Sequence, residues 1–119
     1  MNKFSFANTY NKVTFSIDTT DFAFASLEQL YKEDPAAVHQ IDGLYISTAG
    51  KFGDAPVFIN VARRALVNVP AHMLDTCRDI LGDLDAIEAI KAGAVGFTVY
   101  TYESHNRTCY SVNFVDIVD

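Results

Sequence analysis

Apolar and polar residues alternate over a long stretch near the C-terminus, "VGFTVYTYESHNRTCYSVNFVDI", residues Val95 to Ile117. Successive side chains of a strand point to opposite faces, so a period of two over this length predicts two antiparallel strands joined by a tight turn. With a two-residue turn at Asn106 and Arg107, Val99 faces Phe114 on the side that packs into a core. The stretch therefore predicts a C-terminal hairpin.

The opposite face of this hairpin carries two tyrosines, Tyr100 and Tyr102, beside Ser111 and Asn113. Exposed aromatic rings on such a face can stack nucleic-acid bases, at roughly 1–3 kcal/mol per base. Tyrosine is also common in strands because it fits a half-buried pleated surface. The two tyrosines therefore have two interpretations, a stacking platform or a packing surface.

The chain has 119 residues, half of them hydrophobic. This is enough for a core without disulfides or metals, so we expect one domain, residues 1–119. No apolar run reaches the roughly 18 residues of a membrane helix, and the start, "MNKFSFANTYNK", lacks the apolar stretch of a secretory signal. We therefore expect a cytoplasmic protein of the host cell, with no membrane partner and with Cys77 and Cys109 as reduced thiols.

Two further elements are predicted in the first third of the chain. Alternation in "KFSFA" and "KVTFSID", between Phe4 and Ile17, predicts an N-terminal hairpin. Ser26 stands three residues before Gln29, which is the spacing of a capping box. A short helix is therefore predicted from Leu27 to Glu33.

Three strands and two helices are predicted in the middle of the chain. "IDGLYIST" and "APVFINVA" flank a glycine-bearing connection, and "ALVNV" gives a third strand before Pro70. Asn68 and Pro70 suit the start of a helix, Gly82 is predicted as its left-handed C-cap, and Asp83 as the N-cap of the next helix. The apolar positions that these helices are expected to bury are Met73, Leu74, Cys77, Ile80, Leu81, Leu84, Ile87 and Ile90.

From residue 40 onward the predicted order is three strands, helices and two strands, which is the order of an OB fold. We therefore expect an α+β protein with a curved antiparallel sheet of OB-like order, preceded by the N-terminal hairpin and the short helix. The alternative is an ordinary antiparallel sheet with helices on one side.

Acidic residues outnumber basic ones, fifteen to nine, for a net charge of −6. Residues 1–64 hold seven acids and six bases, a net −1, whereas residues 65–119 hold eight acids and three bases, a net −5. Phosphate backbones are bound mainly through Lys and Arg, so this balance argues against broad nucleic-acid affinity and favours a basic protein partner. The candidate partner-binding residues lie on the two predicted helices: Asp75, Asp79, Asp83, Asp85 and Glu88. The alternative interpretation of these residues is a solvated helix face that keeps a small protein soluble.

A nucleic-acid site remains the alternative, because a few basic residues fall near the predicted sheet edge. Single-strand binders combine such charges with exposed aromatic rings. The candidate residues are Tyr45, Lys51, Phe58, Arg63, Arg64, Tyr100 and Tyr102. Ordinary solvated loop charges and packed rings would give the same sequence pattern.

Histidine and cysteine residues give only a poor zinc pattern. His72 and Cys77 are five residues apart and point about 140° away from each other on a helix, while His105 and Cys109 flank the hairpin turn and supply half a site. We therefore expect no metal and no cofactor. No nucleophile, base or paired-carboxylate pattern has a catalytic spacing, so we do not expect an enzyme.

The segments "DFAFASLEQLY", "IDGLYISTAGKFGDAPVFI", "VPAHMLDTCRDIL", "GAVGFTVYTYES" and "CYSVNFVDI" together resemble a group of small proteins carried by phages and integrative elements of Firmicutes. The resemblance covers most of the chain from about Asp21, and its motifs are structural. Small proteins in that setting include OB-fold single-stranded DNA-binding proteins and inhibitors of host defence such as anti-CRISPR proteins. The resemblance thus implies a protein of a mobile element.

Two functions follow as hypotheses. The first is a non-enzymatic, anti-CRISPR-like inhibitor that binds a basic nucleic-acid-handling defence protein of the host, for example a CRISPR nuclease, through its acidic residues. The second is an OB-like accessory single-stranded DNA-binding protein of a phage or conjugative element.

Overall fold

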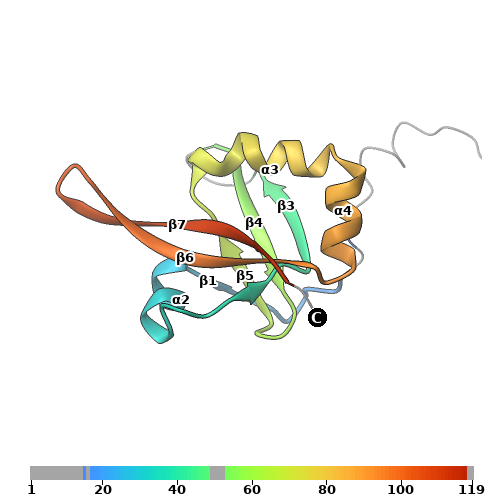
Figure 1. Ribbon diagram of the computed structural model, residues 1–119, viewed down its shortest axis with the longest axis horizontal. Helices are drawn as coiled ribbons and strands as arrows, with labels where there is room; N and C mark the ends of the chain where they lie inside the picture. The colour runs from blue at the N-terminus through green and yellow to red at the C-terminus, as the bar shows by residue number, and fades with distance from the viewer. Residues whose placement is uncertain (1–14, 16, 49–52, 118–119) are drawn as a thin grey trace, which may run out of the picture.

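The strands of this protein form two separate sheets, as the computed structural model in Figure 1 shows for residues 15, 17–48 and 53–117. The first sheet has four strands in the order β1 (Ala23–Ala25), β5 (Ala65–Asn68), β4 (Ala55–Asn60) and β3 (Gly43–Ser47). Its β1 and β5 are parallel and its other pairs antiparallel. The second sheet is antiparallel, in the order β2 (His39–Gln40), β6 (Val95–Ser104) and β7 (Arg107–Asp116).

Helical segments occupy the connections between these strands. Helix α2 (Leu27–Glu33) follows β1, and a single 3₁₀ turn, η1 (Ala71–Met73), leads directly into α3 (Leu74–Leu81) and then α4 (Leu84–Lys91). In Figure 1, α2 and α3 lie on opposite sides of the β6–β7 ribbon. None of the helices in the described part of the chain has the length and hydropathy to cross a membrane.

The α+β class is confirmed, whereas the prediction of one curved antiparallel sheet is wrong. The elements from β3 to β7 follow one another along the chain as predicted, but the strands divide between two sheets and β1 pairs with β5 in parallel. The two sheets do not close into a barrel, so the OB-like arrangement is not confirmed. The predicted N-terminal hairpin lies almost wholly outside the described residues, which include only Phe15 and Ile17 of it.

The hydrophobic core lies between the two sheets and the helices. The Phe58 ring of β4 and the Phe97 ring of β6 have centroids 5.2 Å apart, and both side chains are fully buried. Leu30 from α2 and Cys77 from α3 also belong to this core. Because burying a side chain of this size contributes about 1.5–3 kcal/mol, these contacts fix the positions of the helices relative to the sheets.

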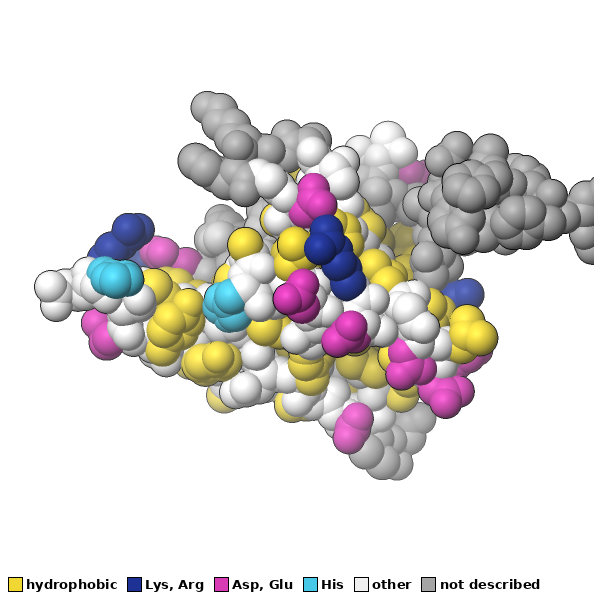
Figure 2. All heavy atoms as spheres, turned by 90° about the horizontal axis from the view of Figure 1, so that it is seen from above, with side chains coloured by type: hydrophobic (Ala, Val, Ile, Leu, Met, Phe, Trp, Pro, Cys, Tyr) yellow, Lys and Arg dark blue, Asp and Glu magenta, His cyan; other side chains and the backbone are white. Residues whose placement is uncertain are grey.

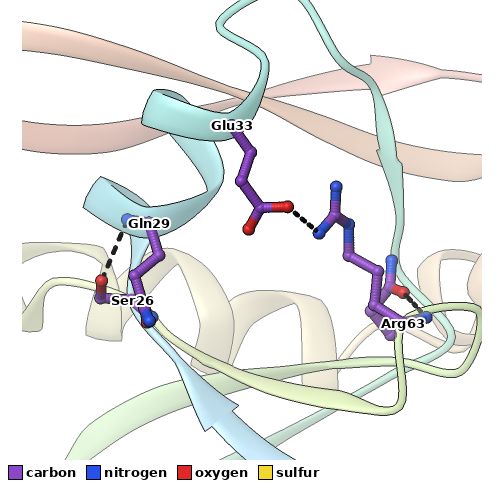
Figure 3. Close-up of polar contacts among 5 residues, drawn as sticks. Ser26, Gln29, Glu33 and Arg63 are labelled. Carbon is purple, nitrogen blue, oxygen red and sulfur yellow. Dashed lines mark hydrogen bonds and ion pairs between the residues drawn. The ribbon is translucent and has the colours of Figure 1, made fainter.

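Local capping explains where the helices begin. Ser26 accepts a hydrogen bond from the Gln29 amide and the Gln29 side chain accepts one from the Ser26 amide, at 3.1 and 2.8 Å (Figure 3), so the predicted capping box and the bounds of α2 are confirmed. Asp83 caps α4 as predicted, because it accepts from the amides of Asp85 and Ala86.

Three details of the helix predictions are wrong. Asn68 caps no helix, since it is the last residue of β5 and η1 has no side-chain cap. Gly82 has a φ of −91°, so the end of α3 needs no left-handed residue. Leu84 is 78% exposed instead of buried, because only the later turns of α4 reach the core, through Ile87 and Ile90.

The β6–β7 hairpin turns one residue earlier than predicted. Ser104 pairs with Arg107, and the two turn residues, His105 and Asn106, have φ values of 52° and 62°. Positive φ at both positions is the mark of a type I′ turn, which matches the twist of the strands. The pairing consequently shifts by two residues, so Val99 faces Val112 instead of Phe114, and the same residues still share a face. Two burial predictions are wrong: Phe114, expected in the core, is 38% exposed, and Ser111, expected on the half-polar side, is fully buried.

Candidate protein-binding surface

Five carboxylates form an acidic face along α3 and α4, and this name is used below for Asp75, Asp79, Asp83, Asp85 and Glu88. All five are exposed. None of them takes part in an ion pair with a described basic residue. Figure 2 shows acidic side chains spread over the side of the molecule formed by these two helices. The acidic face therefore carries five carboxylates that form no ion pair with the described basic residues, although Arg78 and Lys91 lie on the same two helices.

Most basic side chains of the described chain form ion pairs with carboxylates outside the acidic face. Four ion pairs are formed: Lys32 with Glu28, Arg63 with Glu33 (2.9 Å, Figure 3), Arg64 with Asp21, and Arg78 with Asp54 (2.8 Å). Arg78 belongs to α3, but its partner Asp54 precedes β4 and is not part of the acidic face. None of these four pairs involves a carboxylate of the acidic face.

An exposed leucine lies inside the acidic face. Leu84, the first residue of α4, is 78% exposed and stands between Asp83 and Asp85 in the chain. Such a side chain gives a partner an apolar contact at a site where charge brings it in. Leu84 was expected in the core because its helical spacing matches that of Ile87 and Ile90. The one signal of its exposure in the sequence is its place at the first position of α4, directly after the cap residue Asp83.

The tyrosines lie on the projecting part of the β6–β7 hairpin, residues 98–113, called the arm below. Tyr100 is 38% exposed, and its ring centroid is 6.2 Å from that of Tyr102. His72 of η1 lies edge-on to Tyr102 at 6.2 Å, and its Nε2 is 3.2 Å from the hydroxyl of the buried Ser111. This side of the arm thus carries the exposed Tyr100 and the half-buried Tyr102, and His72 of η1 packs against it beside Tyr102 and Ser111.

The arm and the acidic face are neighbours. His72 contacts Tyr102, and Asp75 follows His72 by three residues in the continuous η1–α3 helical segment. In Figure 2 the acidic helices and the apolar and histidine side chains along the arm are visible from the same side. One side of the molecule therefore combines the exposed Tyr100 and the half-buried Tyr102 with carboxylates that form no ion pair with a described basic residue.

The residues predicted for nucleic acid do not assemble into a site. Phe58 is fully buried, so its ring cannot stack on a base. Arg63 and Arg64 are paired with carboxylates, and Lys51 lies outside the described residues. Tyr45 packs against a different apolar cluster, formed with Val57, Ile59 and Leu66, where burial raises its pKa. Tyr100 retains the expected exposed position, whereas Tyr102 is half-buried.

The weak zinc candidates gain no support. His105 lies in the hairpin turn, and the Cys109 thiol is directed to the Arg107 carbonyl, 3.9 Å away. Within residues 15, 17–48 and 53–117, no group of three histidine, cysteine or acidic side chains could hold a metal ion.

A mostly apolar pocket of about 330 Å³ opens between the helices and the base of the β6–β7 hairpin. Among the described residues that line it, Asp116 alone is ionisable. The apolar residues at its walls include Ile80, Ala86, Ile90, Phe114 and Val115. The pocket can accept an apolar side chain, since apolar walls favour burial of apolar groups.

Comparison with known proteins gives no family for this chain: no family model, no curated protein and no solved structure matches it.

Proposed function

We propose that this chain is a non-enzymatic protein of a phage or integrative element that inhibits a nucleic-acid-handling defence protein of its host. The acidic face binds a basic surface of that protein, and a CRISPR nuclease is the favoured partner. The observation that carries this proposal is the set of five exposed carboxylates on α3 and α4, none of them in an ion pair with a described basic residue. A nuclease groove that normally receives nucleic acid has the complementary charge.

Charge and apolar contact have different roles in this proposal. Unpaired carboxylates raise the rate of encounter with a basic protein, and this effect weakens as salt screens the charges. Leu84 and the tyrosines of the arm then supply contacts that exclude water, which determine how long the complex lasts. The proposal therefore expects salt to slow association more than it accelerates dissociation.

A second candidate function, an accessory single-stranded DNA-binding protein of OB-like type, is favoured by one observation. Tyr100 and Tyr102 lie side by side on the arm, 6.2 Å between ring centroids, where bases could stack on them. The neighbouring charge is unfavourable for a phosphate backbone, because Asp75 follows His72 on η1–α3 and Arg63 and Arg64 are already paired. We therefore rank this function second.

The test reverses charge on the acidic face without damaging the helices. Asp83 is left unchanged, because its side chain caps α4. The variant Asp75→Lys, Asp79→Lys, Glu88→Lys is compared with wild type for inhibition of target-DNA cleavage by purified Firmicutes CRISPR nucleases. The matched control is Glu28→Lys, Glu33→Lys, Glu103→Lys, which changes the net charge equally at exposed carboxylates on other elements.

We expect wild type and control to inhibit one of these nucleases and the acidic-face variant to lose inhibition. Equal loss in both variants would assign the effect to net charge, and unchanged inhibition by the acidic-face variant would reject this surface. In parallel, wild type is titrated against a fluorescent oligo-dT strand at low and high salt. Saturable, salt-sensitive binding there, without inhibition of a nuclease, would favour the single-strand function.

A further inference from the structure

The outer edge of β7 carries the features of an unprotected sheet edge. In the described part of the chain β7 pairs only with β6, and the sheet order β2-β6-β7 places it at the end. Its only charged residues are the first and the last, Arg107 and Asp116, and it contains no proline. Natural proteins usually protect such edges with lysine, proline or a bulge, because unpaired backbone groups invite another strand.

The direction of the backbone groups can be read from one hydrogen bond. The amide of Ile117 donates to the carbonyl of Ala94 at 2.8 Å, at the end of the ladder in which Val95 faces Asp116. Backbone groups alternate in direction along a strand. The odd-numbered residues of β7 therefore direct theirs to β6, and the outward set is Thr108, Tyr110, Val112, Phe114 and Asp116.

The arm itself also lacks a covering strand on its other side. β2 pairs with β6 only at Gly96 and Phe97, so the arm beyond this point is two-stranded in the described chain. Figure 1 shows this ribbon projecting past the rest of the described residues. Two-stranded hairpins are at best marginally stable in water, so a third strand would stabilise the arm.

We propose that β7 pairs with β7 of a second copy of this chain, antiparallel and about a two-fold axis perpendicular to the sheet. The result is a dimer with a continuous six-stranded sheet, β2-β6-β7-β7-β6-β2. This interface uses the outer edge of β7, whereas the acidic face consists of exposed carboxylates at α3 and α4.

Self-complementarity of β7 selects the second copy as the occupant. A two-fold axis through Val112 pairs Val112 with itself, and pairs Tyr110 with Phe114 of the second copy. It also pairs Thr108 with Asp116, Ser111 with Asn113, and Cys109 with Val115. Apolar residues thus face apolar residues, polar face polar, and no like charges are opposed.

The same register covers exposed apolar surface. Phe114 is 38% exposed and lines the apolar pocket of about 330 Å³ together with Asp116. Tyr110 and Thr108 of the second copy come to lie beside these two residues, at the rim of the pocket. Each arm is therefore held against the base of the other copy, and both copies direct Tyr100 and Tyr102 to the same side.

Disulfide trapping tests both the dimer and its register. Val115→Cys should form an intermolecular disulfide with the native Cys109 of the second copy, because opposed residues of a non-hydrogen-bonded pair lie about 4.5 Å apart at Cα. Within one chain the two positions are about 20 Å apart along the strand, so an internal bond is excluded. Burial raises the pKa of the Cys77 thiol to about 11, which keeps it from competing.

We expect Val115→Cys to give a covalent dimer under mild oxidation, and the double variant Cys109→Ser, Val115→Cys to give none. Asn113→Cys is the register control, since it opposes Cys109 only if the axis passes through Ser111. A dimer from Asn113→Cys in place of Val115→Cys would overturn the proposed register.

Light scattering on wild type tests the association without any substitution. We expect a mass near twice 13.2 kDa. Phe114→Lys should weaken the dimer at least about tenfold by placing a charge at the edge, whereas Phe24→Lys, at an exposed phenylalanine of the other sheet, should not. A monomeric wild type at about 100 µM, a concentration that favours association, together with no trapping by either cysteine variant, would overturn the proposal.

Discussion

Replacing Asp79 with lysine should stabilise the fold while it weakens partner binding. Asp79 lies in the last turn of α3, where the partial negative charge of the helix end is unfavourable for a carboxylate. It also stands four residues after Asp75, another carboxylate on the same side of the helix. Neither residue takes part in an ion pair with a described basic residue that would offset this repulsion.

The expected gain is about 1 kcal/mol in the free energy of unfolding. Removing the Asp75–Asp79 repulsion contributes about 0.2–0.5 kcal/mol, and the new attraction between Asp75 and the introduced lysine contributes a similar amount. A positive charge near the C-terminal end of α3 adds about 0.3 kcal/mol or more at an exposed position. For a domain of this size, such a gain raises Tm by about 3–5 °C.

Urea unfolding followed by circular dichroism measures this effect without adding salt. The gain should shrink when the experiment is repeated in high salt, because exposed charges are screened. The matched control is Glu28→Lys, which removes a carboxylate already paired with Lys32 at 2.7 Å and should give no gain. A destabilised Asp79→Lys, or a gain that salt does not reduce, would refute the electrostatic reasoning.

Three further predictions test the fold. Burial lowers the pKa of His39 below its usual value of 6.5. The free energy of unfolding should therefore be largest above that pH and fall as the pH drops below it. His39→Gln should flatten this fall in urea titrations between pH 7.5 and 5. Gly96→Ala would bring a Cβ within 2.8 Å of the His39 carbonyl oxygen and should lower the free energy of unfolding by about 1–3 kcal/mol. Gly82→Ala, with no described neighbour closer than 3.6 Å to the new Cβ, should be close to neutral. Equal thermal melts for the two variants would contradict this. Ser26→Ala should cost about 1 kcal/mol through loss of the capping box with Gln29, and Ser26→Asp should restore most of it.

Local signals in the sequence predicted several elements well. The bounds of α2 follow from the Ser26–Gln29 capping box, which is decided by residues three positions apart. The faces of β6 and β7 follow from their period of two. The turn was misplaced because "HN" and "NR" both fit a tight turn, and the two registers differ by two residues and keep the same faces.

Non-local packing decided what the sequence could not show. Phe58 was expected on an exposed face, but β4 is a central strand covered on both faces, where alternation no longer separates inside from outside. The parallel pairing of β1 with β5 joins segments about forty residues apart, and no local pattern encodes it. The ion pairs of Arg63 and Arg64 with Glu33 and Asp21 are equally non-local, so the sequence could not show that these charges are already neutralised.

Exposure of the acidic face was predictable, because carboxylates are seldom buried without a partner. Its proximity to the arm was not, since the contact of His72 with Tyr102 and Ser111 joins residues far apart in the chain. The exposed Leu84 was missed because periodicity gives the face of a helix but not the point at which the core ends.

The most direct test of the central claim is target-DNA cleavage by purified Firmicutes CRISPR nucleases, measured with wild type and with Asp75→Lys, Asp79→Lys, Glu88→Lys at increasing salt. The proposed function predicts that wild type inhibits one of these nucleases at low salt, that salt weakens the inhibition, and that the variant does not inhibit. Inhibition of equal strength by wild type and variant, insensitive to salt, would contradict the claim that the acidic face binds a basic partner.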